Sequence, residues 1–190
     1  GPPRVFVASR DGLPLDLQPT LRRLVALSEG AVLPEDVPAA LAERVRTEAR
    51  TSIRVACLGA LLDRVPYGSA ARAALAAGRE DPDEPVRHLA LRQLAALGEV
   101  LSHGEALSLL GSGQDRDRRA GLRALNLGEP FPEAAVLACL RSGGEGAALE
   151  AAQALVDRGG VGSLGEMERA GRRSDLSAGA RKSIRAAHEA

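Results

Sequence analysis

The chain has 190 residues, of which 35 are Ala and 29 are Leu, and its 25 basic and 25 acidic residues give a formal net charge of zero. Aromatic residues make up only 2% and Trp is absent, so residues that favour β-strands are scarce and a large β-sandwich or barrel is excluded. Ala and Leu are strong helix formers, and a neutral chain has no overall attraction to nucleic acids or membranes, so composition predicts an all-α protein.

The first residues of the chain differ from the rest. Residues 4–9 alternate weakly between apolar and polar and precede the turn signal Asp11-Gly12, which predicts an extended segment over residues 1–16. The start Gly1-Pro2, without Met, is typical of a tag-cleavage scar, and we interpret the chain as a piece of a longer protein. We find no signal peptide and no apolar stretch near the roughly 20 residues of a membrane span, so we expect a cytoplasmic protein.

From residue 17 onward, apolar residues recur at helical spacing, and Gly, Pro and Asp interrupt them at short intervals. Pro and acidic residues at 34–36 and 132–133 are typical of first turns, and Gly98, Gly128 and Gly159 stand where helices should end. The predicted helices span residues 18–29, 35–47, 49–64, 68–78, 84–98, 103–111, 115–127, 132–142, 145–158, 163–172 and 177–188.

Several of these helices repeat one another. A backward shift of the segment 81–98 by 33 residues lays Ile53, Cys57 and Leu61 onto Val86, Ala90 and Leu94, which are also apolar or small. A forward shift of 31 residues places a similar pattern at 113–128. The pattern predicts five helix pairs, each a helix A followed by a helix B, with one extra helix in front. Since one pair cannot bury its apolar face alone, the pairs must stack.

The segment 81–98 carries Asp-Pro-Asp, then Val-Arg, then Ala and Leu at helical spacing, and ends in Leu-Gly. It closely resembles a HEAT repeat, nearest the bacterial HEAT-like type first described in phycobilin lyases. The resemblance covers residues 34–190 and implies an α-α superhelix, a HEAT-like solenoid of about five helix pairs, as a repeat domain over 17–190.

In repeats of this family, Asp and Arg at matching positions tend to link neighbouring repeats. The resemblance implies a link between Asp81 or Asp83 and Arg87, with Arg54 at the matching position of the preceding repeat. It also implies a link between Asp115 or Asp117 and Arg118. The inter-repeat ladder implied by the resemblance is therefore Asp81, Asp83, Arg87, Arg54 and Arg118.

The B helices of such solenoids line the concave surface. At about 100° per residue, His88 and Arg92 fall opposite the apolar stripe of their helix, and the arginines of helices 115–127 and 177–188 also share faces. The predicted partner-binding face consists of His88, Arg92, Arg119, Arg123, Arg181 and Arg185. Acidic residues gather on the A helices, at Glu35, Asp36, Glu43, Glu105, Glu133, Glu166 and Glu168. The alternative interpretation is that both sets are ordinary solvated faces with i,i+4 pairs.

We find no pattern that predicts catalysis, a cofactor or a metal site. The three His and two Cys have no zinc-ligand spacing, and the glycine-rich runs 143–146 and 159–162 join helices rather than following strands as phosphate-binding loops do. Cys57 and Cys139 stand among apolar residues, which predicts buried free thiols and a reducing compartment.

Three functions remain open. The first is a non-catalytic scaffold that binds another protein, or another domain of the parent chain, through an acidic peptide or domain on the B-helix face. The second is binding of a nucleic-acid backbone by the same arginines, against which the neutral charge and the few aromatics speak. The third is a bilin-lyase-like enzyme, which rests on the resemblance alone.

Overall fold

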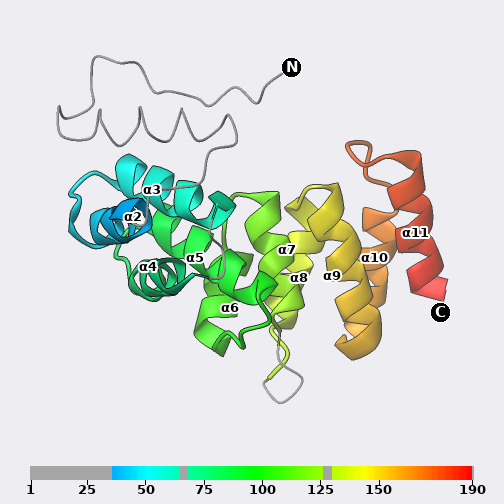
Figure 1. Cartoon of the computed structure of the whole chain (residues 1–190). Helices are drawn as coiled ribbons and strands as arrows, with labels where there is room; N and C mark the ends of the chain where they lie inside the picture. The colour runs from blue at the N-terminus through cyan, green and yellow to red at the C-terminus, as the bar shows by residue number, and fades with distance from the viewer. Residues whose placement is uncertain (1–35, 65–67, 126–129, 190) are drawn as a thin grey trace. The chain divides into compact units, whose positions relative to one another are not determined.

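The structure, a computed structural model, describes residues 36–64, 68–125 and 130–189 (Figure 1). The chain divides into two compact units, one up to Val86 and one from Arg87 onward, which we describe separately. The extended segment predicted for 1–16 and the helix predicted for 18–29 lie outside the described residues.

Among the described residues, the structure contains ten α-helices and a 3-10 helix, and no β-strand. They are α2 (Asp36–Thr47), α3 (Thr51–Arg64), α4 (Ser69–Arg79), α5 (Glu84–Ala96), α6 (His103–Leu110), α7 (Asp115–Arg123), α8 (Glu133–Ser142), α9 (Glu145–Arg158), η1 (Val161–Ser163), α10 (Leu164–Ala170) and α11 (Ala178–Glu189). The ten α-helices correspond in order to the ten predicted between residues 35 and 188, so the all-α class is confirmed. The largest difference is at α7, which ends at Arg123 rather than at residue 127.

Local signals in the sequence explain where several helices begin and end. Ser102 caps α6 by accepting a hydrogen bond from the Glu105 backbone, and the Glu105 side chain accepts one from the Ser102 backbone in return. After α5 the chain turns at Gly98, whose φ of 82° is the only positive value among the described residues. The backbone of Glu99 then donates to the Leu94 carbonyl, which closes the helix with a left-handed glycine.

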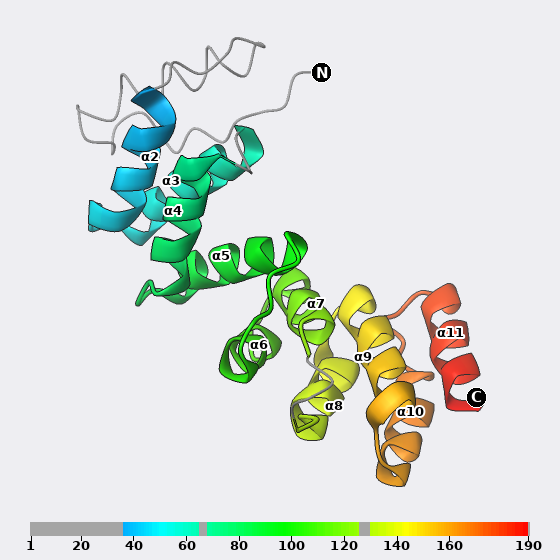
Figure 2. The same ribbon diagram turned by 60° about the horizontal axis from the view of Figure 1, so that its bottom comes forward.

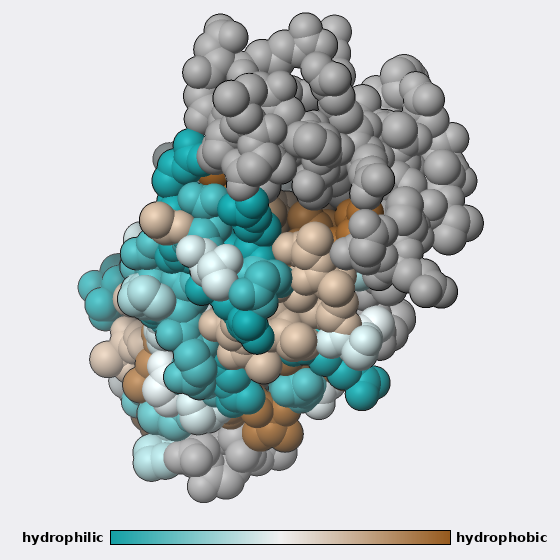
Figure 3. Space-filling view, turned by 60° about the vertical axis from the view of Figure 1, so that its left-hand side comes forward, coloured by the Kyte–Doolittle hydropathy of each residue, from teal (hydrophilic) through white to brown (hydrophobic). Residues whose placement is uncertain are grey.

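In the first unit, α2 packs against both α3 and α4, and α3 also packs against α4. Leu41 and Val45 of α2, Leu58 of α3 and Leu75 of α4 are buried there. Hydrophilic residues cover much of the face that Figure 3 shows, with more apolar residues visible between them. The described part of this unit is a small helical cluster whose buried apolar residues are aliphatic apart from Cys57.

In the second unit, three sequential pairs, α6 with α7, α8 with α9 and α10 with α11, stack side by side (Figure 2). The first helices of the pairs pack on one another, α6 on α8 and α8 on α10, and we call them the A layer. The second helices do the same, α7 on α9 and α9 on α11, and we call them the B layer. This arrangement of sequential helix pairs is the stacking that the repeat pattern predicts.

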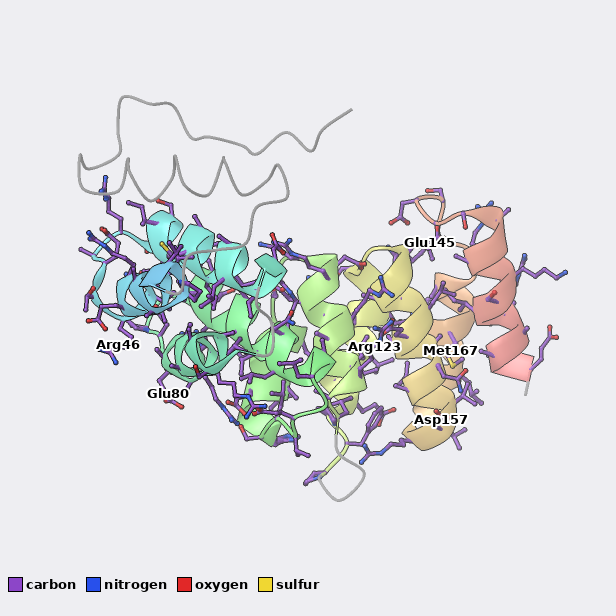
Figure 4. The ribbon with its side chains drawn as sticks, in the orientation of Figure 1. Arg46, Glu80, Arg123, Glu145, Asp157 and Met167 are labelled. Carbon is purple, nitrogen blue, oxygen red and sulfur yellow. The ribbon has the colours of Figure 1, made fainter. Side chains whose placement is uncertain are left out.

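The spacing of the repeats is visible in hydrogen bonds between residues 32 positions apart near the starts of successive B-type helices. The hydroxyl of Thr51 donates to the Asp83 carboxylate, the Asp115 carboxylate accepts from the backbone of Ala147, and Glu145 accepts from the backbone and hydroxyl of Ser177. Figure 4 shows Glu145 at the edge of the molecule where α11 begins. Links near the helix starts therefore join α3 to the turn before α5, α7 to α9, and α9 to the turn before α11.

Small residues allow the layers to approach closely. A Cβ atom on Gly121 of α7 would lie 2.9 Å from the Ala106 carbonyl oxygen and 3.0 Å from Leu109 Cβ, both on α6. No side chain larger than hydrogen fits there without moving a helix. Between the layers lies a core of Ala, Leu, Val, Ile, Met and Cys residues that includes Val136, Leu140, Ala151, Met167 and Ile184.

Candidate functional site

Three residues of the ladder implied by the resemblance, Arg54, Asp81 and Asp83, meet in the first unit. The Arg54 guanidinium donates to both oxygens of Asp81, at 2.8 and 2.9 Å, and to Asp83 at 2.7 Å. It also donates to the carbonyls of Glu48 and Ala49. Arg54 and Asp81 are both 7% exposed, so this is a buried bidentate ion pair that ties α3 to the turn after α4.

The pairing implied for Arg118 differs from the structure. Its guanidinium donates to the carbonyl of Ser112 at 2.6 Å and to that of Ser142 at 3.1 Å, so it links the ends of α6 and α8 through backbone rather than through Asp115 or Asp117. Arg173 does the same one pair later, because it donates to the carbonyls of Leu140 and Gly143. The repeated role is to cap helix C-termini in the A layer, which carry the negative end of the helix dipole.

His88 and Arg92 of α5 meet a buried carboxylate of α7, and we call this group the Asp117 cluster. The Nδ1 atom of His88 lies 3.3 Å from Asp117 Oδ2, and Arg92 donates to Asp117 Oδ1. The hydroxyl of Ser112 donates to Asp117 Oδ2 at 2.7 Å, and His88 Nε2 lies 3.0 Å from the Ser108 hydroxyl. The cluster therefore joins α5, α6 and α7.

The prediction that His88 belongs to the partner-binding face is wrong, because its side chain is buried. His88 is 3% exposed and the Asp117 side chain 2%. The projection of α5 alone predicts His88 on a free face, but the following pair covers that side of the helix. Burial alone would raise the pKa of the Asp117 carboxyl, but the hydrogen bonds from Ser112 and Arg92 outweigh it, and the pKa lies below its ordinary value.

The order Asp117, His88, Ser108 resembles the acid, base and nucleophile of a hydrolytic triad, and its geometry can be judged directly. Ser108 lies inside α6, where backbone N–H groups are used within the helix and are not available to an oxyanion. The Asp117 carboxylate is already neutralised by Arg92. We therefore interpret the Asp117 cluster as a structural polar network, in which each buried polar group has a partner.

Arg119 and Arg123 of α7 converge on one carboxylate of α9, and we call this group the Glu150 clamp. Arg119 Nε donates to Glu150 Oε1 at 3.0 Å, while Arg123 donates through Nη2 to Oε1 at 2.6 Å and through Nε to Oε2 at 3.0 Å. The Arg123 side chain, between α7 and α9 in Figure 4, is 66% exposed, against 22% for Glu150. Two cations and one anion thus leave the Glu150 clamp itself with a net positive charge.

Gly146, one turn before Glu150 on α9, makes room for this clamp. A Cβ atom on Gly146 would lie 2.7 Å from Cδ of Arg119, so the arginine stem passes directly over the glycine. The sequence analysis interpreted this glycine only as part of a turn between helices. Gly146 lies near the start of α9, the B-layer helix that follows α7. A glycine at this place in the sequence could have indicated that a side chain of α7 passes over it.

The other two predicted arginines lie on α11, which packs on α9 and α10. Since α9 also packs on α7, it lies between the two basic helices of the B layer. Arg185 places its stem against Gly171 at the end of α10, where an added Cβ would lie 2.6 Å from Arg185 Cγ. The structure therefore brings together His88 with Arg92, and Arg119 with Arg123, but no contact joins Arg181 or Arg185 to these pairs.

The acidic residues predicted on the A helices are largely engaged with neighbours. Glu166 of α10 receives Arg141 at 2.9 Å and Arg169 at 2.7 Å, and the hydrogen bond from Arg141 lowers its pKa. Glu105 caps α6, and Glu133 accepts from the backbone of Gly160. The acidic face expected there is consequently a set of local pairs rather than a continuous anionic surface; Glu35 lies outside the described residues.

A hollow of about 380 Å³ lies where α5 and α7 end. We call it the α5–α7 hollow, and it is lined by Ala95, Gly98, Glu99, Val100, Leu101, Arg123, Ala124 and Leu125. The side chain of Val100, one of these lining residues, is 76% exposed. Arg123 thus belongs both to the Glu150 clamp and to the edge of an apolar hollow.

Other chemistry is limited in the described part of the chain. No group of three or more His, Cys, Asp or Glu side chains there is arranged to hold a metal ion. Cys57 and Cys139 are buried free thiols, as predicted, and burial raises the pKa of Cys57 to about 11, so it is not a nucleophile at neutral pH. None of the described helices has the length and apolar character needed to span a membrane.

Comparisons with protein-family models, with curated proteins and with solved structures give no significant match to this chain. The helix pairs, their links 32 residues apart and the two charged groups on α7 therefore carry the functional argument by themselves.

Proposed function

We propose that this chain is a HEAT-like helical-repeat module, cytoplasmic and bacterial, that binds an acidic segment of another protein, or of another domain of its parent chain, and performs no catalysis. The stacked pairs, the short inter-repeat turns and the 32-residue links support the repeat assignment. Stacked repeats present extended faces that suit protein binding.

The observation that carries the proposal is the Glu150 clamp. Each guanidinium has five N–H donors, and within the described residues Arg119 uses one and Arg123 uses two of them on Glu150. The remaining donors on these exposed side chains are available to a further carboxylate. Arginine suits such recognition because its planar fork binds carboxylates through two parallel hydrogen bonds.

The test measures binding of fluorescein-labelled peptides of acidic, matched amide (Gln/Asn) and basic composition by fluorescence anisotropy. We expect salt-sensitive binding of the acidic peptides alone, lost in the double variant Arg119→Gln with Arg123→Gln. The matched control is Arg169→Gln with Arg172→Gln, which removes two exposed arginines of the A-layer side and should retain binding. Failure of acidic peptides to bind, or equal loss in both double variants, overturns the proposal.

A second candidate uses the same donors on phosphate. Exposed arginines in one row of α7 also favour a nucleic-acid backbone, for which affinity falls steeply with salt. A random-sequence DNA duplex in the same assay separates the two functions. Binding of the duplex in preference to acidic peptides, lost in the clamp variant and retained in the control, favours nucleic-acid binding.

A further inference from the structure

The α5–α7 hollow adds an apolar element to the charged face. Its walls are the small or aliphatic side chains Ala95, Leu101, Ala124 and Leu125, and its rim carries Val100, which is 76% exposed. Ligand pockets in proteins have volumes of about 300–1,000 Å³, so a hollow of about 380 Å³ fits one large side chain rather than a whole small domain. All of its lining residues belong to the second unit.

The charge at its edge indicates what accompanies that side chain. Arg123 is one of the residues that line the hollow, and its side chain is 66% exposed while it shares Glu150 with Arg119. A carboxylate beside the hollow can accept from Arg123 donors that Glu150 leaves unused. Glu99 stands on the same rim, which disfavours a second acidic group and leaves room for a single anionic contact.

We propose that the α5–α7 hollow receives one aromatic or large aliphatic side chain of a partner peptide, and that an acidic residue adjacent to this anchor binds Arg123. The inference rests on the proposed function and narrows it, because the partner segment is then apolar and acidic rather than merely acidic. Binding sites commonly place one buried anchor at the centre with polar contacts around it.

The protein allows a direct readout, because it contains no Trp and a single Tyr. An acidic peptide with one Trp supplies the only indole in the sample, and its emission shifts to shorter wavelength when the ring enters an apolar site. Two companion peptides change one feature each: Ser replaces the Trp, or Gln replaces the acidic neighbour. A fluorescein label on all three gives their affinities by anisotropy.

We expect the Trp peptide to show the blue shift and to bind about tenfold more tightly than the Ser peptide, since burying a large apolar side chain contributes on that scale. The variant Ala95→Leu fills the hollow and should remove both the shift and the tenfold gain. Ala138→Leu, an exposed alanine of α8, is its matched control. Val100→Ser should reduce the shift, whereas Val161→Ser, at an 85% exposed valine far along the chain, should not.

The outcomes separate this inference from the function on which it rests. If the Trp and Ser peptides bind equally and the emission stays that of a water-exposed indole, the hollow takes no anchor, while binding of an acidic segment stands. If no acidic peptide binds at all, the proposed function itself fails. Equal effects of Ala95→Leu and Ala138→Leu on a tenfold gain would place the anchor elsewhere on the protein.

Discussion

Two groups that involve α7 each bring two basic side chains to one carboxylate, but in opposite surroundings. In the Asp117 cluster, His88 and Arg92 meet one carboxylate that is 2% exposed, and in the Glu150 clamp, Arg119 and Arg123 meet one that is 22% exposed. The first carboxylate also takes the Ser112 hydroxyl, so its oxygens are enclosed by partners. Burial thus turns one group into a structural joint and leaves the other with donors to spare for a ligand.

The largest effect is expected from removing the buried carboxylate. Asp117→Ala leaves Arg92 and Ser112 without their acceptor in a closed site, and breaking a buried ion pair on one side costs about 3–5 kcal/mol. Urea unfolding followed by circular dichroism measures the loss. The control Asp157→Ala removes an exposed acid of α9 and should change the free energy of unfolding by less than about 0.5 kcal/mol. Similar values for the two variants would show that the cluster is not a joint.

A smaller effect separates Gly121 of α7, which lies against α6, from Gly146 of α9, which lies under Arg119. Gly121→Ala places a Cβ against the backbone of α6 and should cost about 1–3 kcal/mol, because neither helix can yield alone. Gly146→Ala meets only the flexible Arg119 stem and gains helix propensity of up to about 1 kcal/mol. Thermal melting compares them. Equal destabilisation by the two substitutions would show that the Arg119 side chain over Gly146 cannot move aside.

The pH dependence of stability tests whether the buried Asp117 carboxylate stabilises the fold, with a substitution of nearly equal size. Because the pKa of Asp117 is lowered in the folded state, its contribution is fully present above the unfolded value of about 3.9 and is lost as the pH falls through the folded pKa. Asp117→Asn should therefore show a shallower loss of unfolding free energy below pH 4 than the unmodified protein. Glu166 and Asp175, whose pKa values are also lowered, act equally in both proteins. Parallel curves would exclude Asp117 as a source of acid sensitivity.

The helix order and pairing were predictable from sequence, because Pro, Gly and capping residues mark the ends of each short helix. Helical projection also placed Arg119 and Arg123 correctly on one face. It failed for His88, since a helix inside a stack is covered on its flank by the next pair, and a single-helix projection shows only the face toward its own partner. The repeat spacing could have indicated the contact with His88, because Asp117 follows His88 by 29 residues, which is close to one period.

The position of Arg54 shows the same limit. The resemblance indicated that Asp81, Asp83 and Arg54 belong to links between neighbouring repeats, but not that both carboxylates would meet Arg54, 27 and 29 residues before them. Pairing across repeats depends on the length of each turn, which residue types alone do not specify. The Glu150 clamp was not predicted for a related reason, because the helical projection of α7 assigns Arg119 and Arg123 to one face and cannot show that α9 brings a carboxylate to them.

The smallest effect is expected at the Glu150 clamp, where a double-mutant cycle with Arg123→Ala and Glu150→Ala measures the coupling between the two side chains. Exposed ion pairs contribute about 0–1 kcal/mol, because the charges remain hydrated and side-chain entropy is lost on pairing. We expect a coupling energy below about 1 kcal/mol that decreases further between low and high salt. A weakly coupled Arg123 can exchange Glu150 for the carboxylate of a partner at little cost. A coupling of several kcal/mol, insensitive to salt, would instead make the clamp a second structural joint, and the binding face would have to lie elsewhere on the repeats.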